Sequence, residues 1–218
     1  MSSIVVSGDT SGAITLQAPA VSGTNTLTLP ASTDTLVGKA TTDTLTNKTL
    51  TSPTITGAVI SAMASSILIS GTAVASTSGT SIDFTGIPSW AKRVTVMFNG
   101  TSTSGTSLKL VQIGNGTIVT TGYVSSASNV STAVTSTSST QGFLVYSGTA
   151  ADLISGTLIL NNVSGNTWIG TLNIKTTTAN CSFGAGDITL AGVLDRLRIT
   201  TVNGTDTFDA GSINILYE

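Results

Sequence analysis

The stretch FTGIPSWAKRVTVMFNG, from Phe84 to Gly100, carries the alternation that decides the fold class. Its second half is predicted to be a strand that follows a turn at Ile87-Pro88-Ser89-Trp90. One face of this strand takes the apolar residues Val94, Val96 and Phe98, and the other takes Thr95 and Met97. A period of two residues is that of a β-strand with one buried face. We therefore predict a central sheet strand here.

Turn signals divide the neighbouring sequence into hairpins. The first is predicted to join Leu108–Ile113 to Thr117–Thr121 through Gly114-Asn115-Gly116. The second pairs Leu158 and Leu160 with the segment from Trp168 to Ile174. The third joins Arg196–Val202 to Ser212–Tyr217 at Asn203-Gly204, and in its last strand Ile213, Ile215 and Tyr217 share a face. Strand segments roughly every 10 residues predict an antiparallel β-sandwich, of jelly-roll type.

Composition indicates an all-β chain in two parts. Ser and Thr make up about a third of the 218 residues, Gly adds 23, and only 8% are charged, which favours strands and turns over helices. Every aromatic residue lies after position 83. Because aromatic side chains supply much of the buried area of a core, we predict an extended region at residues 1–65 and a β-sandwich head at residues 66–218.

The first 65 residues lack the means to build a core. Short strand-like runs occur at Ile4–Val6, Ala13–Leu16 and Thr26–Pro30, and are followed by TDTLTNKTLTSPTITG, Thr42 to Gly57. In this segment Leu45, Leu50 and Ile55 recur at every fifth position. Helices bury residues three and four apart, and strands bury every second residue. One copy therefore cannot bury these side chains in regular structure, and we predict that they mediate oligomerisation, as a homotrimer.

Three segments resemble bacteriophage virion proteins. TLTLPASTDTLVGKATTDTLTNKTLTSPTITGAVI (residues 26–60) is similar to the amino-terminal segment of tail fibres and related fibre or adaptor proteins. SIDFTGIPSWAKRVTVMFNGTSTSG (Ser81 to Gly105) and LDRLRITTVNGTDTFDAGSINILYE (Leu194 to Glu218) resemble the head domain at the carboxyl end of phage tail fibres. The resemblance implies a structural protein on the surface of the phage particle. Residues 1–65 would attach it to another virion protein, and the head would bind a glycan or protein of the host.

Other global features exclude partners and cofactors. The net charge is -2 and no basic cluster is present, so neither nucleic acid nor an anionic membrane is indicated. The longest aliphatic clusters are as short as Ile67-Leu68-Ile69, so neither a transmembrane span nor a secretory signal is predicted. The single cysteine, Cys181, is predicted to be a small buried hydrophobe. No cofactor or metal is expected.

An enzyme that degrades host polysaccharide is the alternative class. The chain contains no histidine, which removes a Ser-His-Asp triad, a Cys-His pair and imidazole metal sites. A glycosidase needs two carboxyls about 5 to 10 Å apart, and Asp206 and Asp209 are the candidates beside the last predicted hairpin. We interpret them instead as acceptors for turn amides, and predict that the chain is not an enzyme.

Candidate recognition residues are few. Lys92, Arg93, Arg196 and Arg198 would form one basic patch if their strands are neighbours, and such a patch would bind anionic lipopolysaccharide or a viral partner. The alternative, which we favour, is that acids such as Asp195 pair with them or that they protect strand edges. Trp90 and Tyr123 would stack on sugar if exposed, and are otherwise core residues.

These patterns predict a tail fibre that takes part in host attachment, located at the phage tail rather than the capsid. A head fibre or capsid decoration protein is the alternative within the virion, since a chain of this length suits an appendage on either. A bacterial surface adhesin is the alternative outside phage, but the expected signal sequence is not seen.

Overall fold

The computed structural model describes residues 3–7, 12–17, 49, 51, 68–150, 152–176 and 180–218. The chain divides into two units, Met1–Val59 and Ile60–Glu218, which are described separately. In the first unit β1 (Ser3–Ser7) pairs antiparallel with β2 (Ala13–Gln17). These strands contain two of the predicted runs. The run at Thr26–Pro30 and the predicted oligomerisation residues Leu45, Leu50 and Ile55 lie outside the described residues.

The second unit, called the head below, is built from antiparallel strands, and its described residues contain no helix. All-β architecture is therefore confirmed for the described part of the chain. Its first seven strands are β3 (Ile69–Ser70), β4 (Val74–Ala75), β5 (Ile82–Thr85), β6 (Arg93–Thr103), β7 (Lys109–Asn115), β8 (Thr117–Ile118) and β9 (Val124–Val130). The others are β10 (Val134–Ser139), β11 (Phe143–Val145), β12 (Ile154–Ser164), β13 (Thr167–Lys175), β14 (Cys181–Thr189), β15 (Arg196–Thr201) and β16 (Phe208–Tyr217).

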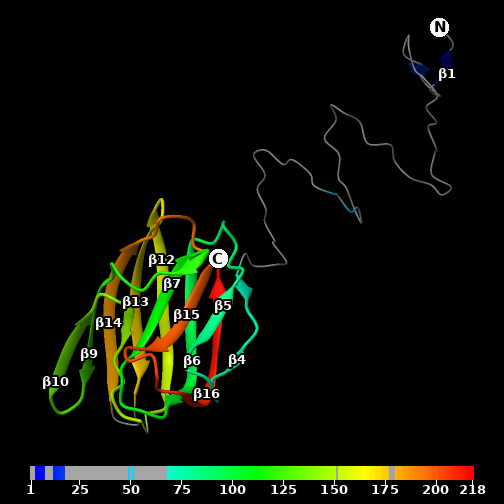
Figure 1. Ribbon diagram of the computed structural model, residues 1–218. Coiled ribbons are helices and arrows are strands. Elements are labelled where there is room, and N and C mark those ends of the chain that lie inside the picture. The colour runs from blue at the N-terminus through cyan, green and yellow to red at the C-terminus, as the bar shows by residue number, and fades with distance from the viewer. Residues whose placement is uncertain are drawn as a thin grey trace. The chain divides into compact units, whose positions relative to one another are not determined.

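These strands form two sheets. The nine-stranded sheet has the order β10-β9-β14-β13-β12-β6-β16-β3, and β4 also pairs with β16. The five-stranded sheet has the order β11-β7-β15-β5, and β8 also pairs with β7. In Figure 1 strands β7, β15 and β5 lie in front of β6, β12 and β13, so the head has two layers.

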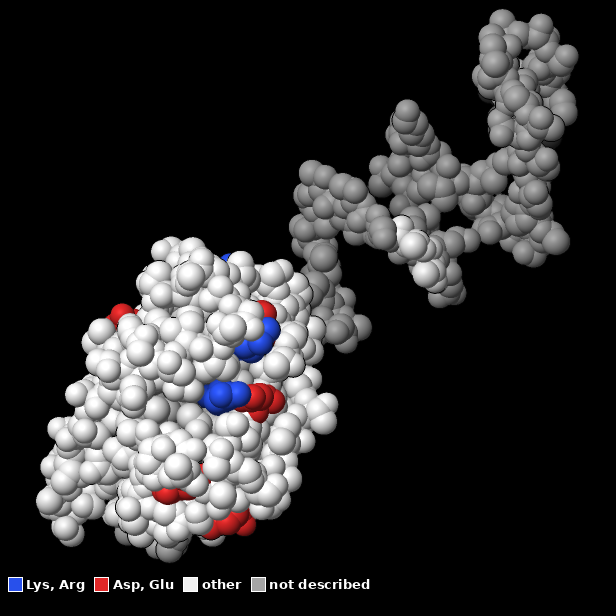
Figure 2. Space-filling model, in the orientation of Figure 1, with Lys and Arg blue, Asp and Glu red and all other residues white. Residues whose placement is uncertain are grey.

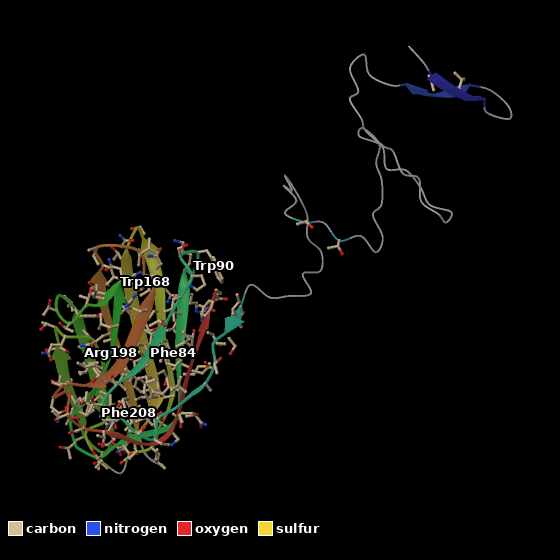
Figure 3. The ribbon with its side chains drawn as sticks, turned by 45° about the vertical axis from the view of Figure 1, so that its right-hand side comes forward. Phe84, Trp90, Trp168, Arg198 and Phe208 are labelled. Atoms are coloured by element: carbon tan, nitrogen blue, oxygen red, sulfur yellow. The ribbon has the colours of Figure 1, made fainter. Side chains whose placement is uncertain are left out.

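One core fills the space between the sheets. The five-stranded sheet contributes Leu197 and Ile199 from β15, and the nine-stranded sheet contributes Val96 from β6 and Leu160 from β12, all essentially inaccessible to solvent. Figure 3 shows that Trp90 lies near one end of the head and Phe208 near the other. Because both sheets share one core, the outward side chains of each sheet form a separate surface.

The strand predicted from Val94 to Phe98 is confirmed as β6, a central strand that pairs with β12 and β16. Val94, Val96 and Phe98 are buried, whereas Thr95 and Met97 are half-buried on the opposite face. Local alternation was sufficient for this prediction because successive side chains of a strand point to opposite faces of the sheet. The apolar residues therefore identify the buried face.

Two of the three predicted hairpins are confirmed. Strands β7 and β8 pair around Gly116, whose φ of 72° is the left-handed conformation that the Asn-Gly signal predicts. Strands β12 and β13 also pair, with Leu158 opposite Leu172 and Leu160 opposite Gly170.

The third predicted hairpin is wrong. Strand β15 pairs with β5 and β7 in the five-stranded sheet, whereas β16 pairs with β6, β3 and β4 in the nine-stranded sheet. Leu197 and Ile215 are both buried, as alternation predicts, but they reach the core from opposite sides. The Asn203-Gly204 turn is followed by a connection that crosses between the sheets, and a strand pattern does not specify which sheet its strand joins.

Candidate functional site

The outward face of the five-stranded sheet is polar. Alternation along β15 buries Leu197 and Ile199 and turns Arg198 and Thr200 outward. On the neighbouring β5, Asp83 lies directly opposite Arg198. The arginine donates two parallel hydrogen bonds, from Nε to Oδ1 and from Nη2 to Oδ2 of Asp83, each 2.7 Å long. This forked geometry holds both side chains in one orientation.

The Asp83–Arg198 pair is accessible to solvent, with side-chain exposures of 41% and 37%. The hydrogen bonds that Arg198 donates to Asp83 raise the pKa of Arg198 above its ordinary value, and the opposite charges of the pair offset each other. Water screening leaves such an exposed pair with little effect on stability. Its main consequence is therefore to present a fixed donor and acceptor array on the surface.

Two adjoining cavities, of about 330 and 340 Å³, flank this pair and share Thr120 and Arg198. We call them together the polar groove. Its polar lining comes from hydroxyl, amide and paired charged side chains: Thr80, Ser81, Asp83, Thr85, Gln112, Thr117, Thr120, Gln141, Arg196, Arg198, Thr200, Thr201 and Asn203. Such a lining offers many hydrogen-bond donors and acceptors, and each of its three charged side chains, Asp83, Arg196 and Arg198, takes part in an ion pair.

One wall of the polar groove is the segment 116–122, and Tyr123 anchors it. The Tyr123 hydroxyl accepts a hydrogen bond of 2.7 Å from the Ile113 amide. Its proton is shared between the carbonyl oxygens of Ile113, 3.1 Å away, and Val119, 3.0 Å away. Strand β11 pairs with β7 only from Lys109 to Val111, so the tyrosine satisfies backbone groups of β7 beyond the end of β11.

Burial raises the pKa of Tyr123 to about 12, and its ring packs edge-on against Phe143 with centroids 5.3 Å apart. Tyr123 is thus a core residue, which is the second of the two roles that the sequence allowed for it. Trp90 is 45% exposed and packs on Tyr217 at a centroid distance of 5.8 Å. Neither aromatic lines the polar groove.

The opposite wall is the turn after β15. Asn203 accepts hydrogen bonds through Oδ1 from the Thr201 hydroxyl, at 2.8 Å, and from the Thr205 amide, at 3.1 Å. Its side-chain amide donates to Asp206 at 2.7 Å. Between the walls, Gln112 donates to the Gln141 carbonyl at 2.9 Å. Both walls are therefore fixed by internal bonds, and the groove is formed before any ligand arrives.

The four predicted recognition residues do not come together as neighbouring strands. Arg196 and Arg198 lie on β15 in the five-stranded sheet, whereas Lys92 and Arg93 lie at the start of β6 in the other sheet. Arg93 pairs with Glu218 at 2.8 Å and Arg196 with Asp195 at 2.8 Å, and Lys92 donates to Asn162 at 3.4 Å. On the face that Figure 2 displays, basic side chains lie beside acidic ones on a mostly uncharged surface. Pairing with acids, which is one part of the favoured alternative, fits Arg93, Arg196 and Arg198, whereas Lys92 contacts an amide.

The candidate catalytic pair lies outside the polar groove. Asp206 accepts a hydrogen bond from the Ser107 amide at 3.0 Å as well as that from Asn203, and these bonds lower the pKa of its carboxyl, with the Asn203 bond the larger cause. Asp209 accepts from the Ser102 hydroxyl. A glycosidase acid needs a raised pKa, which is the opposite of what Asp206 has.

Three further findings concern sites of other kinds. The described residues hold no cluster of three or more His, Cys, Asp or Glu side chains fit for a metal ion. Within the same residues no helix is long and apolar enough to cross a membrane. The prediction that Cys181 is buried is wrong: it starts β14 at an outward position and is exposed, because composition does not say which face of a strand a residue takes.

Sequence reasoning identified Arg196 and Arg198 but missed the groove around them. Gln112 and Thr120 belong to no motif. For Tyr123 the sequence predicted only that the side chain is either exposed or part of the core. The Asn-Gly hairpin followed by a tyrosine was the available signal for the anchored wall. Comparison with protein-family models, curated proteins and solved structures finds no match to this chain.

Proposed function

We propose that the chain is a non-enzymatic structural protein of a bacteriophage virion, and that its head contacts the host surface through the polar groove. The observation that carries this proposal is a preformed, hydrogen-bonding groove on a rigid β scaffold, in which every charged side chain is ion-paired. Such a surface suits a hydroxyl-rich glycan or a polar protein segment, which can exchange hydrogen bonds with water for hydrogen bonds with the groove at little cost in ordering. Tail fibre is our first choice.

We also propose that the head is a jelly roll. If the short strands β3 and β8 and the strands β9, β10, β13 and β14 are set aside, the nested pairs are β4 with β16, β5 with β15, β6 with β12, and β7 with β11. The first strand thus pairs with the last, the second with the last but one, and so on inward. This is the pairing of one long antiparallel ribbon rolled into two sheets, which supports the jelly-roll assignment.

The absence of catalytic activity is part of the proposal. What supports it is the lack of histidine in the chain, the lowered pKa of Asp206, and the pairing of the groove's own carboxylate, Asp83, with Arg198. Both oxygens of the Asp83 carboxylate already accept hydrogen bonds from Arg198.

For the amino-terminal region we propose that residues 1–65 assemble as a homotrimer and attach to another virion protein. This rests on the five-residue spacing of Leu45, Leu50 and Ile55 and on the resemblance of residues 26–60 to fibre proteins. A tail position is our first choice, and a head fibre or capsid decoration protein is the alternative. The neighbour of residues 1–40 distinguishes them: a tail nozzle or baseplate protein in one case, the major capsid protein in the other.

The groove is tested with the purified full-length chain on cells of the bacterium that the encoding phage infects. Arg198→Ala should reduce binding to cells at least tenfold. Arg93→Ala is the matched control, because Arg93 forms the same kind of exposed ion pair, with Glu218 at 2.8 Å, outside the groove. Equal binding by both variants and the unchanged chain would exclude the groove as the contact.

Location is tested on the virion. Antibodies raised against the purified chain should label phage particles at the tail, and cryo-electron microscopy of the whole particle should place the first unit against a tail protein. Label on the shell, together with normal adsorption by particles that lack the protein, would favour a decoration protein. Absence of the chain from purified particles would refute the virion assignment.

A further inference from the structure

The outward side chains of β12, β13, β14, β9 and β10 form a second surface, which we call the lateral face. Strand pairing places Ile169, Asp187 and Val124 side by side in one row across β13, β14 and β9. A row further along the strands places Cys181 between Lys175 and Val130, with Val134 beyond. The register therefore makes one continuous surface from strands that are distant in sequence.

The lateral face is apolar for a surface of this head. Val124 and Val134 are each 67% exposed, Phe183 46% and Ile169 41%. The remaining outward residues are mostly Ser, Thr and Ala, including Thr171, Ala185, Ser126 and Ser128. These apolar side chains are interspersed with small polar ones, and exposed apolar surface gathered on one face usually marks an interaction site.

The edge next to this face is unprotected. Strand β10 pairs with β9 on one side and ends the nine-stranded sheet; Figure 1 shows it at the margin of the head. Edge strands commonly carry Lys, Pro or a bulge that discourages pairing with other chains. The sequence from Val134 to Ser139, VTSTSS, has none of these residues, and its pairing with β9 is regular.

Among the described residues, two charged side chains lie on the lateral face, at its opposite ends. Lys175 is the last residue of β13 and lies opposite Cys181 on the antiparallel strand β14. Asp187 lies on β14 six residues after Cys181. Neither takes part in an ion pair within the described residues, whereas Arg93, Arg196 and Arg198 all do. The charge pattern is therefore self-complementary: two copies laid face to face in inverted orientation bring Asp187 of one toward Lys175 of the other.

The shape of the face is self-complementary in the same orientation. A hollow of about 490 Å³ opens at the Asp187 end, lined by Val124, Ile169, Thr171 and Ala185 among others. Phe183 lies two residues toward the Lys175 end on β14. The inversion that brings the two charges together also places Phe183 of one copy over the hollow of the other.

The area is sufficient for a stable contact. Five strands about 4.8 Å apart, each contributing about seven residues with a rise of about 3.4 Å, cover about 570 Å² per copy. Two copies then bury about 1,100 Å², above the roughly 1,000 Å² that a specific interface needs. We propose that the lateral face binds a second copy of this chain about a twofold axis. The contact does not rest on the proposed groove or trimer, and it would join heads of two separate assemblies.

The single cysteine makes the contact measurable in the full-length chain. Because the inverted arrangement puts the Cys181 row over the Asp187 row, Asp187→Cys should form intermolecular disulfides under mild oxidation and give a covalent dimer of twice 21.8 kDa. Within one chain the two positions are about 20 Å apart along β14, too far for an internal disulfide. Thr85→Cys, on the outward face of the other sheet, is the matched control and should give no such dimer.

Adding Phe183→Glu to Asp187→Cys should abolish the covalent dimer without changing the melting temperature, since Phe183 is an outward residue. At low salt, Lys175→Asp should weaken association of the chain in sedimentation, and Lys175→Asp with Asp187→Lys should restore it. The proposal is overturned if Asp187→Cys forms no more dimer than Thr85→Cys, if its dimer survives Phe183→Glu, or if the double charge reversal associates no better than Lys175→Asp.

Discussion

Tyr123→Phe is the most informative single substitution, because it removes one hydroxyl and leaves the ring packing on Phe143 intact. The hydroxyl accepts from the Ile113 amide at 2.7 Å and donates toward the carbonyls of Ile113 and Val119. In the variant the Ile113 amide is buried without its acceptor. An unsatisfied buried donor costs about 1–3 kcal/mol, so we expect a loss of about 2 kcal/mol in the free energy of unfolding, or about 4–8 °C in melting temperature.

The same substitution has a pH signature. Burial raises the pKa of Tyr123 from 10.0 to about 12 in the folded chain, so the unfolded chain loses this proton first as pH rises. The stabilisation is fully present below pH 10 and is lost as pH rises toward 12. A shift of about two units corresponds to about 2–3 kcal/mol. Tyr123→Phe should lack this alkaline loss, whatever other groups titrate in the range.

Urea unfolding at pH 7 and pH 11 measures both effects, and amide hydrogen exchange reports the groove wall. Amides in the segment 116–122 should exchange faster in Tyr123→Phe, while those of β6 should change only with global stability. The reasoning is refuted if the variant melts within 1 °C of the unchanged chain and shows the same decline between pH 10 and 12. Tyr123 would then be an ordinary core residue and the wall would be held by other contacts.

Three further predictions concern the head. Ile215→Asp should cost about 4 kcal/mol and cause aggregation, because a charge would be buried at a core position that is 3% exposed; an unchanged melting temperature would contradict the core assignment. Lys109→Met should destabilise by about 3 kcal/mol, since buried Asp152 loses a cation with which it interacts electrostatically. Adding Asp152→Leu should recover most of that loss in urea unfolding, whereas additive losses would show that the two residues are uncoupled. A fragment of residues 66–218 should fold alone with a β-type circular dichroism spectrum, because the core cluster runs from Ile82 to Ile215; an unstructured fragment would show that the head needs the first unit.

Features set by neighbouring residues could be predicted from the sequence. The alternation of Val94, Val96 and Phe98 assigned the buried face of β6, and Gly114-Asn115-Gly116 located the β7–β8 turn, because strand periodicity and turn conformation depend on a few adjacent residues. The buried face of β16 followed in the same way. The resemblance to phage fibre proteins, and the role of Leu45, Leu50 and Ile55, remain predictions.

Features that join distant segments were decided only by the tertiary structure. Arg198 meets its partner Asp83 across 115 residues of chain, and β15 and β16 join different sheets although they are consecutive. Whether Cys181 and Tyr123 are exposed or buried likewise depended on which strands lie beside them. By itself, the sequence determined the all-β class of the described chain and the inward faces of β6 and β16, because these follow from local periodicity. The polar groove and the lateral face arose only when register brought strands from different parts of the chain together, since hydrogen bonding between strands, unlike alternation within one, is set by the packing of the whole head.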